Sequence, residues 1–429
     1  MTGDGAHSVA LRDCPLCGLI STVPHNVRGV AASCPQCTSS LGRIWHPDMR
    51  IPRGWALAAG LFYLLALAGP FVQISIFGRL QRADIATGPL QLTVQGFDLV
   101  GFLVLAVTII FPGIKLGIVL LTLFGIRLEH QPTRFLKAIF RWYPLIGPWA
   151  MVDVYLLGFL VAYTRLTAMA TVHLDLSLFA LVGLMISMAA LDGSLDTGAI
   201  WDALDTGPAP RPIDADHRGG HLIGCHCCFL INRAEPGMAC TRCDTVLRDR
   251  KPDSIVRSWA FVIAAMALYI PANLYPVMLI TQLARTTPFT IMGGIVELFA
   301  AGLWPLGLLV LLASIAIPLV KLLSMACMLI EAQRPSGRHL LGLTRTYRFV
   351  AFIGRWSMID VFMVSILVAL VRFGQFANVQ ASTGAACFAG VVVITMFAVE
   401  SFDPRLMWDG AREAAPETPP DPTLIAEPA

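Results

Sequence analysis

Four pairs of cysteines are the residues whose type and spacing most clearly predict chemistry. Each pair has the form CxxC, and the pairs occur as two modules. The predicted ligands are Cys14, Cys17, Cys34 and Cys37 in the first module and Cys225, Cys228, Cys240 and Cys243 in the second. Two such pairs bring four thiolates into a tetrahedron that suits zinc, and a site closed by four cysteines has no open position for a substrate. We therefore expect two structural zinc sites, with rubredoxin-like iron as the chemical alternative.

The second module contains additional candidate ligands. Its first pair reads "CHCCF", so His226 and Cys227 lie between the two predicted cysteines. We favour Cys225 and Cys228 because only this choice keeps two residues between the ligands. Cysteines elsewhere in the apolar runs are expected to be small packing residues.

Ionisable residues inside the apolar runs form the second group with potential chemistry. The phrase "GPWAMVDVY" places Asp153 in one run, and "GRWSMIDVF" places Asp360 in another. Lys115 and Lys321 lie at a similar depth in the runs that precede them. An unpaired charge is costly in hydrocarbon, so we expect one ion pair between Lys115 and Asp153 and another between Lys321 and Asp360.

These ion pairs have two interpretations that the sequence leaves open. They could fix the register of neighbouring helices, or they could belong to a polar relay that is protonated or reoriented during work. The relay is better supported in the second half, which adds the polar residues Glu297, Ser324, Ser365 and Glu400. In "YIPANLYP" a proline and an asparagine are expected to interrupt the apolar run, making Asn273 and Pro276 candidate cavity residues, with a simple kink as the alternative.

The elements that must position these residues are membrane helices. Hydrophobic residues make up 56% of the chain and charged residues 14%, against about 25% charged in a soluble domain. Runs of about 20 apolar residues can cross a bilayer. The sequence predicts eight such spans, at residues 55–76, 98–125, 142–165, 172–191, 256–280, 294–330, 348–373 and 380–400. The fold expected is an all-α polytopic membrane protein.

Composition and motifs also argue against other classes of protein. The net charge of +3 is too small to indicate a nucleic-acid partner. The sequence shows no phosphate loop, GxSxG elbow or HExxH helix, so we do not expect an enzyme.

Basic residues in the loops predict the orientation. The loops after the second and sixth spans are the richest in them, containing Arg127, Arg134, Lys137, Arg141, Arg334, Arg338, Arg345 and Arg348. Such loops favour the cytoplasmic side. Both termini and both cysteine modules are therefore expected in the cytoplasm, where thiols stay reduced.

The two halves of the chain repeat one another. "GPWAMVDVY" and "GRWSMIDVF" are separated by 207 positions, and "PGIKL" and "PLVKL" by 206. An even number of spans in each half makes this a parallel repeat. We expect zinc ribbons at 1–50 and 206–251, four-helix membrane units at 51–205 and 252–410, and a disordered tail at 411–429.

The ordered combination of motifs resembles the paraquat-inducible protein A family over about residues 10–410. The resemblance rests on the two CxxC modules, "NLYP", the two PxxK motifs, "GRWSMIDVF" and "SFDPRLMWD". It implies two tetraspanin-like units in the inner membrane of a Gram-negative bacterium. It also implies a periplasmic MCE-domain partner whose rings form a tunnel for lipid, with phospholipid loaded or received by this chain. Lys321 and Asp360 match motif positions that would contribute to an intramembrane polar network, and an ion gradient is a conceivable energy source.

Two other functions remain open. The chain could be a stand-alone proton-coupled transporter of a small amphipathic molecule, using the same buried charges. It could also be a membrane scaffold that transports nothing, with its zinc ribbons docking a cytoplasmic protein.

Overall fold

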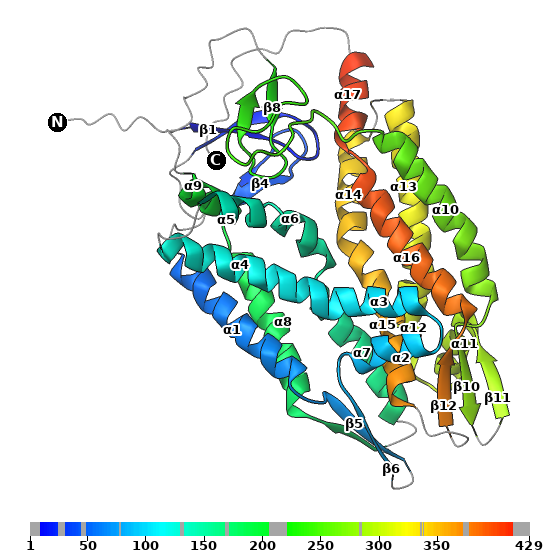
Figure 1. The fold of residues 1–429 in the computed structure, drawn as a ribbon. Helices are drawn as coiled ribbons and strands as arrows, with labels where there is room; N and C mark the ends of the chain where they lie inside the picture. The colour runs from blue at the N-terminus through cyan, green and yellow to red at the C-terminus, as the bar shows by residue number, and fades with distance from the viewer. Residues whose placement is uncertain are drawn as a thin grey trace.

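The structure, a computed structural model, describes most of the chain (Figure 1). The described residues are 9–24, 31–43, 49–76, 79–128, 133–167, 171–205, 221–282, 285–334, 337, 339–371 and 377–414. The segment 206–220 and residues 415–429 of the expected tail lie outside them.

Each cysteine module consists of short antiparallel hairpins. In the first module the strands are β1 (Val9–Asp13), β2 (Ile20–Pro24), β3 (Ala31–Ser33) and β4 (Ser40–Arg43). In the second they are β8 (Leu222–Gly224) and β9 (Ile231–Arg233). In Figure 1 the two modules lie together at one end of the molecule.

The first half of the helical body follows the first module. Its elements are α1 (Arg50–Leu67), β5 (Val72–Ile76), β6 (Arg79–Ala83), α2 (Thr87–Val94), α3 (Asp98–Leu105), the π-helical turn η1 (Ala106–Ile110), α4 (Phe111–Leu128), α5 (Thr133–Phe140), α6 (Tyr143–Ile146), the 3-10 turn η2 (Gly147–Trp149), α7 (Val152–Thr167), β7 (Thr171–Leu174), α8 (Leu176–Ser194) and α9 (Thr197–Leu204).

The second half repeats this order almost element for element. It comprises α10 (Ser254–Leu274), β10 (Met278–Gln282), β11 (Arg285–Phe289), α11 (Ile291–Ala300), α12 (Trp304–Leu311), the π-helical turn η3 (Leu312–Ala316), α13 (Ile317–Gln333), α14 (Leu340–Ile353), the 3-10 turn η4 (Gly354–Met358), α15 (Ile359–Leu370), β12 (Ala377–Ala381), α16 (Thr383–Ser401) and α17 (Arg405–Ala414). The π-helical turns begin at 106 and 312, which are 206 apart, and α8 and α16 begin at 176 and 383, which are 207 apart.

A three-stranded antiparallel sheet closes the end of each half away from the cysteine modules (Figure 1). The strand orders are β6-β5-β7 and β11-β10-β12, so the same strand is central in both copies. Val72 pairs with both Ala83 and Leu174. The sequence analysis predicts no strands here: the expected spans include all of β5 and parts of β7, β10 and β12. Strands of four or five residues are too short to show a clear alternation.

Among the described residues, seven helical segments are long and apolar enough to cross a membrane, whereas eight were expected. They are Asp98–Arg127, Thr133–Thr164, Leu176–Ser194, Ser254–Leu274, Gly307–Gln333, Leu340–Leu370 and Thr383–Ser401. The span expected at 55–76 corresponds to α1, which carries Arg50 and Arg53 in its first turns and ends at Leu67. Residues 72–76 form β5 instead.

Two other expectations about helix continuity were wrong. The run at 294–330 is divided between α11 and α12, because Gly302 adopts a left-handed conformation (φ 77°) that ends α11. Conversely, Pro271 and Asn273 do not interrupt α10, which continues through both and ends at Leu274, within "YIPANLYP" and before the expected end of the span at 280. The Asn273 side chain donates a hydrogen bond to the Tyr269 carbonyl (2.8 Å), within the same helix.

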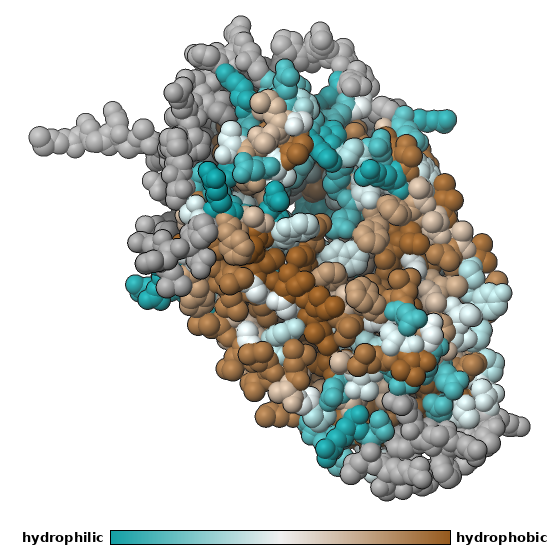
Figure 2. Space-filling view, viewed as in Figure 1, coloured by the Kyte–Doolittle hydropathy of each residue, from teal (hydrophilic) through white to brown (hydrophobic). Residues whose placement is uncertain are grey.

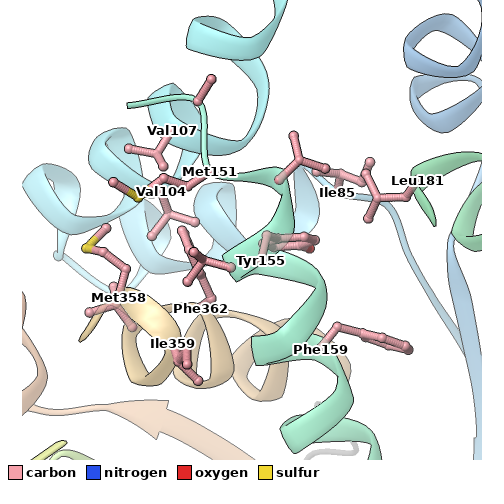
Figure 3. Close-up of a cluster of buried hydrophobic side chains, with 14 of the residues drawn as sticks. Ile85, Val104, Val107, Met151, Tyr155, Phe159, Leu181, Met358, Ile359 and Phe362 are labelled. Atoms are coloured by element: carbon pink, nitrogen blue, oxygen red, sulfur yellow. The ribbon is translucent and has the colours of Figure 1, made fainter. Parts of the chain in front are cut away.

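The core is continuous across the two halves. In Figure 3 Tyr155 and Phe159 on α7 lie beside Ile359 and Phe362 on α15. The rings of Tyr155 and Phe362 meet edge to face, with centroids 5.6 Å apart. Figure 2 shows hydrophobic side chains covering the helices between hydrophilic ends. This distribution is that of a helical protein surrounded by lipid.

Candidate functional site: two cysteine clusters and an asymmetric polar core

Each module brings its four predicted thiols together. The Sγ atoms of Cys14, Cys17, Cys34 and Cys37 lie within 4.8 Å of one another, as do those of Cys225, Cys228, Cys240 and Cys243. One pair of sulfurs in each cluster, Cys14–Cys37 and Cys225–Cys243, is 3.4 Å apart. That is far longer than a disulfide bond, about 2.05 Å, and near the edge of about 3.8 Å in a tetrahedron with zinc–sulfur bonds of about 2.3 Å. Both clusters therefore fit a four-cysteine metal centre.

The backbone of each CxxC pair forms the same tight turn. The residue after the second cysteine donates its N–H to the carbonyl of the first cysteine, at 2.9 to 3.0 Å, and has φ between 57° and 72°. These residues are Gly18, Thr38, Phe229 and Asp244. Three of them are not glycine, and a left-handed backbone at such residues persists only where the surroundings hold it. Closure of four ligands on one ion would supply that constraint.

Neither extra candidate in "CHCCF" belongs to the second cluster. The Cys227 Sγ atom points to the Arg141 carbonyl oxygen, 3.9 Å away. His226 contacts the Arg248 carbonyl through Nε2 at 3.2 Å. Cys225 and Cys228 complete the cluster, as the spacing predicts.

Each module docks on the half of the body that it does not precede. The first module contacts the C-terminal helix α17, where Arg405 forms a salt bridge with Asp13 (2.9 Å). The second contacts α9 of the first half, where Arg242 bridges Asp202 (3.0 Å) and Asp205 (3.2 Å). Burial raises the pKa of Asp13, and the neighbouring Arg405 opposes that shift. Arg250, at the end of the second module, also pairs with Asp409 on α17 (2.6 Å), so this module contacts both halves.

In the second half, Lys321 is buried and bonds to hydroxyl groups. Its ammonium donates to Thr395 Oγ1 (2.7 Å) on α16 and to Ser357 Oγ (3.3 Å) in η4, in place of the predicted Asp360. Each hydroxyl also donates to a backbone carbonyl of its own helix, at 2.8 Å. The lone pairs of both hydroxyls are therefore directed at the lysine.

Asp360, on α15, forms a second polar contact, with the helical stretch that also carries Lys321. Its carboxyl group is hydrogen-bonded to Ser314, which lies in the π-helical turn η3 and also contacts the Val310 carbonyl at 2.7 Å. Both residues line a cavity of about 40 Å³ whose other walls are largely apolar. This volume exceeds the ~15 Å³ that one water molecule requires.

In the first half, the predicted pair of Lys115 and Asp153 is absent. Lys115 is buried, but its ammonium pairs with Asp192 on α8 (2.7 Å). Tyr143 donates a further hydrogen bond to the same carboxylate (3.1 Å). Asp153 is exposed at the start of α7.

The remaining predicted residues are dispersed. Glu297 is exposed on α11, Ser324 is half-buried, and the Glu400 side chain is exposed at the end of α16. Ser365 is fully buried against Gly88 of the first half, where an added Cβ would lie 2.5 Å from its Oγ. Asn273 and Pro276 do not line the cavity beside Asp360; the neighbouring Val277 does.

Sequence reasoning missed the actual partners of these charged residues. Lys321 bonds to Ser357 and Thr395, Lys115 pairs with Asp192, and Asp360 bonds to Ser314. Ser357 lies within "GRWSMIDVF" and replaces Ala150 of the first copy, a difference that could have singled it out. Thr395 likewise replaces Met188, since 395 and 188 differ by 207. Serine and threonine are common enough in membrane helices that they carry little signal alone.

Fold and site together define a multi-pass membrane protein built from a tandem helical repeat with two buried four-cysteine clusters. The sequence pattern of the family described as "Paraquat-inducible protein A" matches residues 52–205 and 255–412, once in each half. The chain belongs to this family.

Curated relatives match nearly end to end. The chain is 30% identical to the "Intermembrane transport protein PqiA" of Escherichia coli strain K12 over 410 residues, covering 94% of this chain and 97% of that protein. It is 29% identical to the "Lipophilic envelope-spanning tunnel protein A" of the same strain, covering 92% of this chain and 90% of that protein. A "Probable intermembrane transport protein" of Haemophilus influenzae is 24% identical, with 92% and 95% covered. No solved structure matches the chain.

Proposed function

We propose that this chain is the inner-membrane subunit of an intermembrane lipid transport system. It would load or receive phospholipid at the base of a periplasmic tunnel formed by an MCE-domain protein, without covalent change to the lipid. The observation that carries the proposal is the full-length similarity to two proteins named for intermembrane transport and for an envelope-spanning tunnel. The two matches cover 94% and 92% of this chain and 97% and 90% of the relatives, so the function of the whole relative is the relevant comparison.

The buried polar core supports an active role for the second half. Lys321 has neutral partners at its ammonium, so it can change protonation without leaving a buried carboxylate unpaired. Ser314 has one hydrogen, and its contacts with Asp360 and Val310 are both satisfied when the carboxyl group carries the proton. These two sites would couple an ion gradient to the movement of helices around them.

We propose zinc as the ion in both clusters, with a structural role. The clusters are closed by four cysteines and buried, and closed four-cysteine sites are typical of structural zinc. Their predicted place is the cytoplasm, together with both termini. In that orientation α1 serves as an eighth span, equivalent to α10, with Arg50 and Arg53 at the cytoplasmic surface.

The first experiment is affinity purification of the full-length chain from native membranes, with mass spectrometry of bound proteins and lipids. Recovery of a periplasmic MCE protein with phospholipid is expected. Recovery of the chain alone with bulk lipid would contradict the tunnel partnership. A native membrane protein that carries no tag and has a similar number of spans provides the background lipid.

A second candidate is a stand-alone proton-coupled transporter of a small amphipathic molecule. The same buried groups around Lys321 and Asp360 favour it. Substrate flux by the isolated chain in liposomes, with no partner present, would select this function over the tunnel subunit. If Lys321 and Asp360 could both be replaced with full activity retained, the scaffold interpretation would be preferred to either transporter.

A further inference from the structure

A cavity of about 500 Å³ lies between the two halves, and its walls come from equivalent positions of the repeat. Lys115 and Lys321, 206 apart, both line it, as do Pro148 and Arg355, 207 apart. Lys251, which follows the second cysteine module, also lines it, so the cavity lies toward the module end. Transporters with internal repeats commonly bind substrate at the interface between the repeats.

The cavity carries an excess of positive charge. Four cationic side chains line it, those of Lys115, Lys251, Lys321 and Arg355, against two carboxylates, Asp192 and Glu400, which leaves 4 − 2 = +2. The volume of this cavity lies within the range of small-molecule sites, about 300–1,000 Å³, and its lining combines charged groups with apolar wall.

The cationic side chains that line the cavity differ in whether a carboxylate or a carbonyl of the protein neutralises or solvates their charge. Lys115 is paired with Asp192. Lys251 donates to the backbone carbonyls of Glu400 and Phe402, and burial lowers its pKa. Arg355 forms no ion pair with any residue that the structure describes. Its guanidinium is therefore the group at this wall that is available to an anion.

We infer that this cavity binds the phosphate group of an anionic phospholipid, with Arg355 as the principal ligand and Lys251 as the second. This assignment rests on the proposed function and names the lipid class. A guanidinium presents paired N–H donors that match phosphate oxygens. Met396, Val350 and Val399 supply apolar wall for the glycerol region. The acyl chains are too large for about 500 Å³ and would leave between the helices toward the surrounding lipid.

Binding at this site would act directly on the polar core. Arg355 and Ser357 lie in the same 3-10 turn, η4, and Ser357 accepts a hydrogen bond from Lys321. Lys321 itself lines the cavity. A phosphate held by Arg355 would compete with Ser357 and Thr395 for the ammonium, and so would link headgroup occupancy to the state of the core.

The test uses the full-length protein in phosphatidylcholine nanodiscs, titrated with photo-crosslinkable phosphatidylglycerol. We expect Arg355→Gln to weaken crosslinking about tenfold and Lys251→Gln about threefold, whereas Arg355→Lys recovers part of the loss. Arg345→Gln is the matched control, since Arg345 is an exposed arginine on the preceding helix α14. Equal crosslinking by wild type and Arg355→Gln would overturn the assignment, as would equal loss in Arg345→Gln.

Excess inorganic phosphate distinguishes a lipid from a soluble anion. We expect no displacement of the lipid at millimolar phosphate; displacement would identify a site for a soluble anion and overturn the lipid assignment. Lipid transfer between membranes is measured separately. Transfer by wild type together with normal crosslinking by Arg355→Gln refutes the cavity site alone. Arg355-dependent crosslinking by a wild type that transfers no lipid refutes the proposed function alone.

Discussion

The two halves place a lysine at the same position of the same fold but surround it with different chemistry. Lys321 meets the hydroxyls of Ser357 and Thr395, whereas Lys115 meets the carboxylate of Asp192. The positions equivalent to the two hydroxyls are Ala150 and Met188, which are apolar. A duplicated ion pair would have suggested a shared architectural need. The observed difference instead suggests that the first copy keeps a compensated structural charge and the second keeps a group that can change state.

The largest effect on lipid transfer is expected from replacing Lys321, and the same replacement of Lys115 is the direct comparison. Lys321→Met should reduce lipid transfer at least a hundredfold, because it removes the group proposed to change protonation. Lys115→Met should retain more than a third of the activity, since Lys115 is already neutralised by Asp192. Transfer is measured in cells or in reconstituted complexes, normalised to the amount of protein in the membrane. Equal losses in the two variants would remove the functional distinction between the halves.

The hydroxyl partners should matter less than the lysine itself. Thr395→Val keeps the side-chain volume but removes the acceptor at 2.7 Å, and loss of a hydrogen bond to a charged group is worth about 1.5 kcal/mol, or about tenfold. Ser357→Ala, with its longer contact of 3.3 Å, should cost about threefold. Transfer rates at matched protein levels provide the measurement. If both variants worked as wild type, the hydroxyls would be packing groups only.

How well the sequence predicts this structure differs between the cysteines and the membrane charges. The CxxC spacing alone identifies all eight clustered thiols, because four ligands on two turns leave little geometric freedom. The ion pairs were placed by depth in the bilayer, and depth does not determine the rotation of a helix about its axis. Asp153 is exposed at the start of α7, and its predicted depth could not have shown which way it faces.

Longer-range features were harder still to predict. The docking of the first module on Arg405, nearly the full chain length away, has no local signature. Each three-stranded sheet pairs strands that are separated in the sequence by the helices of the same half, as in the pairing of Val72 with Leu174. The repeat itself was visible because each copy keeps its glycine, tryptophan and aspartate at one offset.

Loss of one metal ligand should affect both halves, because each module docks on the half that it does not precede. Cys34→Ser and Cys240→Ser are each expected to lower protein levels several-fold while activity per molecule changes less than twofold. Metal analysis should show one ion lost per chain in either variant. Normal protein levels with abolished transfer would contradict a structural role for the clusters, and would indicate that the metal takes part in the transport cycle.

The smallest net change in lipid transfer is expected from a variant that gives Lys115 the same hydroxyl partners as Lys321. Asp192→Asn alone should destabilise the chain by about 2 kcal/mol, because it leaves the buried Lys115 without its carboxylate. Adding Ala150→Ser and Met188→Thr supplies the two hydroxyls that Lys321 has, and should recover most of that loss in thermal unfolding. Lipid transfer should stay within about twofold of wild type, because the first half has no equivalent of the contact between Asp360 and Ser314. The aspartate at the equivalent position, Asp153, is exposed. A large change in transfer with full recovery of stability would show that the charge state of Lys115 also affects the transport cycle. The two halves would then differ in how strongly each lysine is coupled to transport, and Lys115 would not be purely structural.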